Sequence, residues 1–370
     1  MNIKEWSAEI LRKIDKKMEV QCGRLEGKIP YTPENGYYTD KGEENLSCWT
    51  NGFWGGILWQ LYHATGKEIY SEHAQALEVR LDGAIEAYEH LHHDVGFQWL
   101  HTAVANYRLT GNERSRVRGL HVANLLAGRY NPSGKFINAW NGDSSGWMII
   151  DTLMNLPLLH WASDVAKLPH LSYIANEHVN TTLKNLIRTD GTARHIGIMD
   201  VHSGELMESL AGQGYGPETT WSRGQAWAIY GLTLSYRYTG NLEHLGAAKK
   251  VAHHFMAQIT QTAFIPLVDF RAPAEPVKFD TTAGLCVACG LLEMMNHVPE
   301  GEKEFYFNFA TKIVKATEEK YANWELEQDS IIDYGTEAYH SGKTHVPIIY
   351  GDYFFIEAIL RLQGLDFLIW

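Results

Sequence analysis

A short motif, Tyr-x-x-Thr-Gly, occurs three times in this 370-residue chain and limits what the chain can fold into. Its copies lie in "LYHATGK" (61–67), "NYRLTGN" (106–112) and "SYRYTGN" (235–241). Each copy follows an apolar stretch with helical spacing and precedes a second helical stretch that carries Ala and His. Glycine between two such stretches is typical of a helix end. Each copy therefore predicts a helical hairpin.

The same plan is repeated less regularly in the rest of the chain. Looser copies lie at 156–175 and 291–310, and "GDYFFIEAILRLQG" (351–364) supplies a last helix, which makes about six hairpins. Helices that are apolar on most faces alternate with more polar ones, as in an inner ring wrapped by an outer ring. We therefore expect an all-α fold, a single (α/α)6 toroid over residues 1–370 with no second domain. An open α-solenoid is the alternative.

The composition is that of a soluble globular protein, with 45% hydrophobic and 21% charged residues. Residues 1–20 mix charges with apolar residues at helical spacing, unlike a signal peptide, and no apolar run of about 18 residues predicts a membrane span. The formal charge of −12 disfavours nucleic acids and anionic membranes as partners. This net charge is still compatible with a small anionic substrate that binds in a local basic pocket. We expect a cytoplasmic protein, either a monomer or a weak homo-oligomer.

The four cysteines, Cys22, Cys48, Cys286 and Cys289, are too few for a disulfide framework. Cys286 and Cys289 lie in the apolar run "TTAGLCVACGLLEMM", which predicts a buried helix. We interpret this pair as packing residues rather than as a redox or metal site.

The segments between the hairpins hold the residues that could take part in binding or catalysis. Trp, Gly, His, Asp and Arg gather at 45–59, 90–99, 138–151, 193–200 and 211–231, just before the expected inner helices. In a toroid these loops would meet at one mouth. Twelve tryptophans exceed what packing requires, and indole faces beside hydrogen-bonding groups suit sugar rings. The pattern favours a carbohydrate site, although aromatics filling the toroid's axis would explain part of it.

Several of these segments resemble one enzyme family. "CWTNGFWGGILW", "HHDVGF", "IIDTLMNLPLL", "TWSRGQAWAIYG" and "GDYFFIEAILRL" are similar, in this order from about Trp49 to Gln363, to the unsaturated glucuronyl hydrolases of glycoside hydrolase family 88. The resemblance implies an (α/α)6 barrel, no metal or other cofactor, and release of a terminal 4,5-unsaturated uronic acid from glycosaminoglycan oligosaccharides made by polysaccharide lyases. Unsaturated rhamnogalacturonyl hydrolases share this fold and chemistry and are the nearest alternative.

The resemblance also implies roles for individual residues. One family carboxylate matches Asp94, and the catalytic acid/base matches Asp151. The implied substrate-binding residues are Trp49, His93, His195, Gln213, Trp221, Arg223 and Trp227. The loop 339–353 differs among family members in a way linked to sulfated substrates. Its Ser341, Lys343 and Thr344 offer two hydroxyls and one cation, either as a cradle for a sulfate or as an exposed turn.

The implied substrate chemistry explains why two carboxylates are needed. Protonation of C4 in the enol ether leaves an oxocarbenium-like C5 that water captures, and the resulting hemiketal opens and expels the sugar chain. This route needs an acid with a raised pKa and a group that takes a proton from water. Asp151 follows the apolar "MII", which would raise its pKa, and a nearby Asp94 would raise it further.

Each carboxylate also has a purely structural interpretation. Asp151 fits the N-terminus of a helix, where the helix dipole stabilises acids, and Asp94 fits a turn or an N-cap. A non-catalytic carbohydrate-binding toroid would not need both acids. An ordinary inverting glycosidase would need them about 6.5–9.5 Å apart and would accept saturated sugars.

The histidine-rich stretch "HLHHDVGFQW" (90–99) raises the question of a metal site. His90, His92 and His93 are expected to diverge in an extended or a helical segment, and no HExxH pattern follows them. We therefore expect these histidines to tune Asp94 or to contact the sugar rather than to hold a metal.

Overall fold

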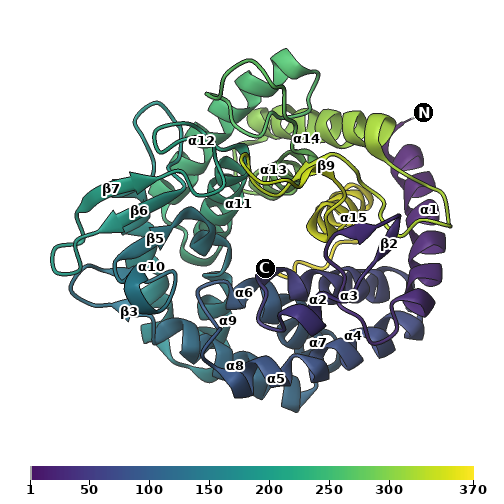
Figure 1. Ribbon diagram of the computed structural model, residues 1–370, viewed down its shortest axis with the longest axis horizontal. Helices are drawn as coiled ribbons and strands as arrows, with labels where there is room; N and C mark the ends of the chain where they lie inside the picture. Colours follow the sequence, from purple (N-terminus) through teal and green to yellow (C-terminus); the bar gives the residue numbers. More distant parts are fainter. Residues whose placement is uncertain (1) are drawn as a thin grey trace.

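Two concentric rings of helices surround a central axis in the computed structural model, which describes residues 2–370 (Figure 1). The inner ring contains α3 (Phe53–Thr65), α6 (Val95–Trp99) joined by a π turn (Leu100–Val104) to α7 (Ala105–Thr110), α9 (Pro157–Ala166), α11 (Ser222–Thr239), α13 (Thr281–Met294) and α15 (Ile349–Gln363). The outer ring contains α1 (Ile3–Arg24), α4 (Glu68–Arg80), α8 (Glu113–Ala127), α10 (Pro169–Asn185), α12 (Leu242–Ile259) and α14 (Glu300–Tyr321). Inner and outer helices alternate along the described chain, so the predicted all-α toroid of six hairpins is confirmed.

Burial explains which helices lie inside. Every residue of α13 is buried, including Cys286 and Cys289, as its continuous apolar sequence predicts. In α14 the buried residues are Tyr306, Ala310, Ile313, Val314 and Thr317, which form one stripe at helical spacing. A helix surrounded on all sides needs apolar residues on every face, whereas an outer helix needs only one such stripe.

The three Thr-Gly motifs end inner helices in the same way. Gly66, Gly111 and Gly240 each adopt a left-handed conformation, with φ of 69°, 74° and 67°. Their amides donate to the carbonyl of the motif's tyrosine at 2.7–2.8 Å, and the motif's threonine hydroxyl donates to the carbonyl four residues before it. The repeated motif therefore acts as a helix stop that reverses the chain into the next outer helix.

The ring closes where the first outer helix meets the last inner one. Gln363, the last residue of α15, donates to the carbonyl of Lys4 in α1 at 2.7 Å. The buried ammonium of Lys17 in α1 donates to the carbonyls of Asn323 and Glu325 at 2.8 and 2.9 Å. An open solenoid would leave these two ends apart, so that alternative is wrong.

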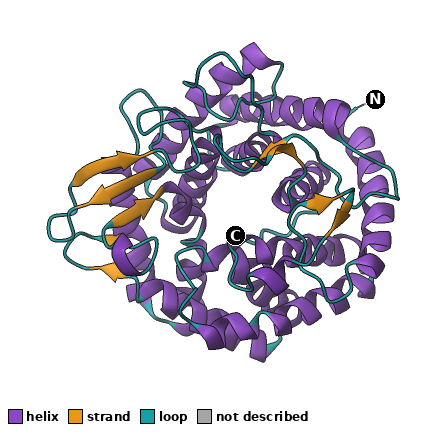
Figure 2. Ribbon diagram, viewed as in Figure 1, coloured by secondary structure: helices purple, strands orange, loops and turns teal. Residues whose placement is uncertain are grey.

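Short strands, which the sequence analysis did not predict, lie in the loops between the helices (Figure 2). The largest sheet is antiparallel and joins β5 (Trp147–Ile149), β6 (Ile196–Met199) and β7 (Leu206–Leu210) in that order. The two-stranded pairs are β1 (Pro33–Glu34) with β2 (Tyr37–Tyr38), β3 (Tyr130–Asn131) with β4 (Phe136–Ile137), and β8 (Gly335–Thr336) with β9 (Thr344–Val346). Two short helices, α2 (Lys41–Glu44) and α5 (Asp82–Ala87), and four 3₁₀ turns, at Trp49–Gly52, Gly142–Ser144, Ile150–Met154 and Thr260–Thr262, complete the described elements.

The C-terminus lies near the centre of the toroid (Figure 1), and the residues just before it contact the end of α7. Trp370 is fully buried, and its indole donates to Glu357 of α15 at 3.1 Å. Its ring lies 4.5 Å from that of His101 in the π turn. Arg108, near the end of α7, donates to the carbonyls of Leu368 and Ile369 at 3.0 and 2.9 Å. This end of the axis is therefore closed by packed side chains.

No helix within residues 2–370 is both long enough and apolar enough to span a lipid bilayer.

The Thr-Gly stop predicts a stability effect that can be measured directly. In Gly240→Ala an added Cβ would meet no atom within 4 Å, so its cost comes from the left-handed backbone alone. We expect the free energy of unfolding, obtained from urea denaturation, to fall by about 1–2 kcal/mol. Gly246→Ala, within α12 and equally free of contacts, is the matched control and should be stabilising by about 0.5–1 kcal/mol. Shifts of the same sign would contradict this account of the motif.

Candidate active site

The segments that precede the inner helices meet at one end of the toroid and bring most of the predicted residues together. Trp49 lies in the turn before α3, Asp94 immediately precedes α6, and Asp151 lies in the 3₁₀ turn Ile150–Met154 before α9. Trp221 and Arg223 lie at the start of α11. The mouth therefore forms where the loop analysis predicted it.

The small sheet places Asp151 beside His195. Ile149 at the end of β5 pairs with Ile196 at the start of β6, and the amide of Ile150 donates to the carbonyl of His195 at 3.0 Å. The Nε2 atom of His195 consequently lies 3.5 Å from Oδ2 of Asp151. The amide of Gln213 and the carbonyl of Ala211 lie 3.0 and 3.1 Å from Nδ1 of His195. The amide can only donate and the carbonyl can only accept, so these two contacts favour opposite tautomers of His195.

Asn155 links the two carboxylate segments. Its side-chain amide donates to Oδ1 of Asp94 at 3.1 Å and to the carbonyl of Asp151 at 3.2 Å. Its side-chain oxygen accepts from the amide of Phe97 at 2.9 Å. The two segments approach so closely that a Cβ at Gly96 would lie 2.6 Å from Cα of Asn155. Glycine at position 96 therefore permits the contact that orients Asp94.

Histidines surround the other oxygen of Asp94. Nε2 of His93 lies 3.3 Å and Nδ1 of His92 lies 3.5 Å from Oδ2 of Asp94. Nδ1 of His93 is 3.0 Å from the hydroxyl of Thr152, which fixes the buried ring. Asp94 occupies the N-cap position of α6, but its side chain makes no capping hydrogen bond. Asp94 is therefore a turn residue at the N-cap position, as one structural interpretation expected, but its carboxylate does not cap the helix and lies against His92, His93 and Asn155 instead.

The surroundings of Asp94 favour its protonated form. Burial raises the pKa of Asp94 well above its ordinary value, and the charge of Asp151 raises it further, while the amide of Asn155 and the guanidinium of Arg129 act in the opposite direction. Burial lowers the pKa of His93 well below its usual range and that of His92 to about 4, so both rings are neutral at pH 7. The sequence led us to expect a raised pKa at Asp151; the clear increase in the structure is at Asp94.

The histidines do not diverge as the sequence suggested. One ligand atom from each of His92, His93 and Asp94 lies within 4.8 Å of the others, because residues 91–94 form a turn rather than an extended or helical segment. Of the three histidines, only His90 is exposed. The positive charge of Arg129 lowers the pKa of both His92 and His93, and the same field would repel a metal cation. Packing of neutral imidazoles against the carboxylate of Asp94 is therefore the better account of this cluster.

Arg223 is fully buried and mostly occupied by the protein itself. Its Nη1 forms an ion pair with Asp280 at 2.5 Å and donates to the carbonyl of Thr336 at 2.7 Å, while Nη2 donates to the carbonyl of Glu337 at 2.6 Å. Gln213 donates to the same carbonyl of Glu337 at 3.0 Å. These contacts hold the starts of α11 and α13 and the β8–β9 hairpin together at the mouth.

Aromatic rings form the wall and floor of the mouth. The ring of Trp221 lies 4.1 Å from that of His195, and the guanidinium of Arg223 stacks on it at 4.7 Å. Trp49 is partly exposed and packs edge-on against Trp227, which is completely buried. Trp221 therefore lies beside His195, which contacts Asp151, while Trp49 and Trp227 pack against each other.

Seven of the buried side-chain polar atoms that lack a hydrogen-bond partner within residues 2–370 belong to residues of this mouth, and others are spread through the fold. The seven are Oδ2 of Asp151, Nε2 of His93, Nε2 of His195, Nε of Arg223, Nε1 of Trp221, Nε1 of Trp227 and the hydroxyl of Tyr350. Buried polar groups are normally paired, so a cluster of unpaired ones points to a place where a polar ligand binds.

The predicted sulfate loop borders the mouth. The amide of Tyr339 donates to the carbonyl of Gln213 at 2.9 Å, which ties the β8–β9 hairpin to the site. Ser341 uses its hydroxyl within its own turn, donating to the carbonyl of Ala338 at 3.0 Å. Lys343 is exposed, with its ammonium 4.9 Å from the ring centre of Tyr31, and Thr344 begins β9.

Three residues of the site were missed by the sequence analysis. Tyr350 packs 5.1 Å from Trp49 and beneath the guanidinium of Arg223. It lies in the first turn of α15, so the rule that the starts of inner helices form the mouth would have found it. Asn155 follows Asp151 by four residues, and residues at this spacing are neighbours on a helix, so the sequence could also have indicated Asn155. Thr152 gave none, because its contact with His93 depends on tertiary packing.

Comparison with known proteins gives a consistent family. Residues 23–268 match the sequence profile of Glycosyl Hydrolase Family 88. The chain is 36% identical over 327 residues to the unsaturated glucuronyl hydrolase of Bacillus sp. (strain GL1), which covers 85% of this chain and 86% of that protein.

Two solved structures support the same relationship. That of the unsaturated glucuronyl hydrolase from Bacillus sp. GL1, responsible for the degradation of glycosaminoglycan, superposes with a TM-score of 0.92 at 31% identity, covering 96% of this chain and 97% of that one. A substituted unsaturated glucuronyl hydrolase from Streptococcus agalactiae, complexed with dGlcA-GalNAc6S, gives a TM-score of 0.85 at 27% identity, covering 99% of this chain and 94% of that one.

The raised pKa of Asp94 predicts that this residue opposes folding at neutral pH. A carboxyl group whose pKa in the folded protein exceeds its unfolded value of about 3.9 lowers the stability of the protein as the pH rises from the unfolded to the folded pKa. Asp94→Asn keeps the oxygen that Asn155 binds and removes the charge. We expect the free energy of unfolding to increase in this variant, with a larger gain at pH 8 than at pH 5.

Urea denaturation at the two pH values measures this difference. Asp200→Asn is the control, because the amides of His202 and Ser203 lower the pKa of that exposed carboxyl and the variant should gain nothing at pH 8. Equal destabilisation of Asp94→Asn at both pH values would show that the carboxyl is not held with a raised pKa.

Proposed function

This chain belongs to Glycosyl Hydrolase Family 88, and we propose that it releases the terminal 4,5-unsaturated uronic acid from glycosaminoglycan oligosaccharides by hydration of the C4=C5 bond. The observation that carries the proposal is the pair of carboxylates, Asp94 and Asp151, set among unpaired polar atoms in an aromatic mouth. A non-catalytic sugar-binding protein would have no use for a buried carboxyl group whose pKa a second carboxylate raises.

The site is proposed to hold one proton on its carboxylates at neutral pH. Burial and the charge of Asp151 raise the pKa of Asp94 well above its ordinary value, so a proton is retained above the usual carboxyl range. Asp151 is the member with an unpaired oxygen, and it delivers this proton to C4 of the substrate. The electron pair of the C4=C5 bond forms the new C–H bond, and positive charge develops on C5 and the ring oxygen.

Water completes the reaction by attacking C5. Its oxygen bonds to C5, and the proton it loses restores the protonated carboxylate pair. The hemiketal at C5 then opens, and the hemiacetal formed at C1 releases the rest of the oligosaccharide as an alcohol. His195, whose Nε2 lies 3.5 Å from Oδ2 of Asp151, is proposed to stabilise the ionised carboxylate between the two proton transfers.

The uronate carboxylate is proposed to bind near Arg223. The Nε–H of this guanidinium is the donor that the protein leaves without a partner, and the ion pair with Asp280 fixes its orientation. A charge-assisted hydrogen bond of this kind is worth about 1.5–3 kcal/mol. Trp49 and Trp221 would contact the faces of the sugar, and Gln213 its hydroxyls, as the family resemblance implies.

The catalytic unit is proposed to be one cytoplasmic copy of the chain, folded as a single domain and independent of metal ions. In this proposal Asn155 orients the carboxyl group of Asp94, and burial and the charge of Asp151 tune its pKa, which are tasks that a metal would otherwise perform.

Reaction in heavy water tests the mechanism, because hydration and direct glycosidic cleavage label the product differently. The proton that reaches C4 comes from an exchangeable acid, so the released uronic acid should carry one deuterium at C4, seen by NMR. Direct displacement at C1 leaves C4 unlabelled.

Asp151→Asn should lower kcat by roughly 10²–10⁴-fold with little change in substrate affinity. Asp164→Asn, in α9 of the same inner ring, is the control and should keep normal turnover. Absence of label, or near-full turnover by Asp151→Asn, would favour an ordinary inverting glycosidase.

A preference for sulfated substrates is a second expectation, carried by the exposed ammonium of Lys343 at the rim. Lys343→Ala should reduce kcat/KM for a 6-sulfated unsaturated disaccharide several-fold more than for its unsulfated form, because only the former loses an ionic contact. The substitution Lys315→Ala is matched, since that ammonium also lies over an aromatic ring, that of Trp6 at 5.2 Å, on the outer helices. Equal losses on both disaccharides would place Lys343 outside the substrate site.

A further inference from the structure

We propose that Arg129 is a positioning residue for Asp94: it fixes the backbone that carries this carboxylate and supplies a positive charge that faces it. The proposal rests on the proposed function, in which Asp94 is one of the two reacting carboxylates. Arg129 follows the end of α8 and lies outside every segment that the family resemblance marked.

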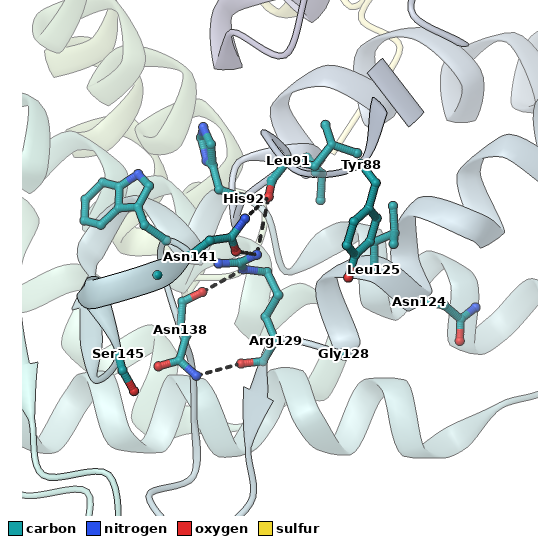
Figure 3. Close-up of a pocket in the computed structure, with 13 residues that line it drawn as sticks. Tyr88, Leu91, His92, Asn124, Leu125, Gly128, Arg129, Asn138, Asn141 and Ser145 are labelled. Carbon is teal, nitrogen blue, oxygen red and sulfur yellow. Dashed lines mark hydrogen bonds between the residues drawn. The ribbon is translucent and has the colours of Figure 1, made fainter. Parts of the chain in front are cut away.

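The guanidinium of Arg129 joins two loops (Figure 3). Its Nε donates to the carbonyl of Asn138 at 2.9 Å and its Nη2 to the carbonyl of Ala139 at 3.1 Å. Its Nη1 donates to the side-chain oxygen of Asn141 at 2.7 Å and to the carbonyl of Leu91 at 3.4 Å. All four acceptors are neutral, so the geometry is that of a clamp on main-chain and amide oxygens rather than of an ion pair.

The clamp acts on the catalytic segment through shared acceptors. The carbonyl of Ala139 that Arg129 binds also accepts from the amide of His93 at 3.1 Å. Asn141, oriented by Arg129, donates to the carbonyls of Glu89 and Leu91 at 2.9 and 3.3 Å. The backbone on both sides of His92 is therefore held by groups that Arg129 orients, and Asp94 is the next residue but one.

Charge adds a second effect. His92 and His93 from its own loop and Asn155 from the turn before α9 contact Asp94, while Asp151 and Arg129 act on it through their charges. His92 and His93 are neutral at pH 7, so Arg129 is the cation of this set. Its field favours the ionised form of Asp94 and opposes the effect of Asp151. Loss of the charge would shift the titration of the carboxylate pair to higher pH.

The surroundings allow substitution without disturbing the toroid. Arg129 lines a polar cavity of about 360 Å³ that also borders Tyr88, His92, Asn124 and Trp140 (Figure 3). A shorter side chain at position 129 would enlarge this cavity and leave the apolar core between the rings intact. The effect of the variant can therefore be separated from unfolding.

Two variants separate geometry from charge. Arg129→Gln removes the charge and most of the clamp, whereas Arg129→Lys keeps the charge and loses the forked donors. On a lyase-made unsaturated disaccharide we expect kcat to fall about tenfold or more in both, because small displacements of a catalytic group are costly. The pH–kcat profile should move upward by about 0.5–1 unit in Arg129→Gln and stay in place in Arg129→Lys.

The control is Arg108→Gln, which also loses hydrogen bonds to backbone carbonyls but at the closed end of the axis. It should lower the thermal midpoint and leave the pH profile unchanged. A folded Arg129→Gln with the wild-type pH–kcat profile would overturn the proposal, even if its kcat or stability were reduced. Inactivity of the wild-type enzyme on the disaccharide would instead refute the proposed function, so the two failures are distinguishable.

Discussion

Closure of the helical ring is the constraint on which the rest of this structure depends. It is made by residues more than 300 positions apart, such as Lys17 with Asn323 and Gln363 with Lys4. The buried ammonium of Lys17 is costly to remove from water unless its donors are bound, and the two carbonyls provide those bonds. Because the ring is closed, the loops before the inner helices converge on one mouth instead of following an open curve.

Convergence alone does not make a reactive site, and the local contacts at the mouth do the rest. The β5–β6 pairing sets His195 against Asp151, while Asn155 holds Asp94 in place. The two carboxylates thus receive different surroundings: a buried one among neutral imidazoles, and one with a free oxygen facing the site. Such an asymmetry lets one pair of identical groups act as both acid and base.

Much of this arrangement was predictable from local sequence. The Thr-Gly stops, the all-apolar α13 and the loop clusters before inner helices depend on neighbouring residues, so the hairpins and the mouth followed from pattern. The convergence of His92 and His93 was not predictable, because the turn at 91–94 is held by the distant Ala139. The ion pair of Arg223 with Asp280 and the orientation of Asp94 by Asn155 likewise join residues brought together only by the closed ring.

The tryptophan that fills the far end of the axis has a consequence for how polymers are handled. A channel open at both ends would let a polysaccharide thread through and be cut internally. Trp370, packed among His101, Tyr353 and Phe354, instead closes the axis with aromatic side chains. A sugar chain therefore cannot pass through the axis, and its end has to enter from the mouth. The released monosaccharide must then leave through the same entrance by which the next chain end binds, so product release has to precede binding of the next substrate.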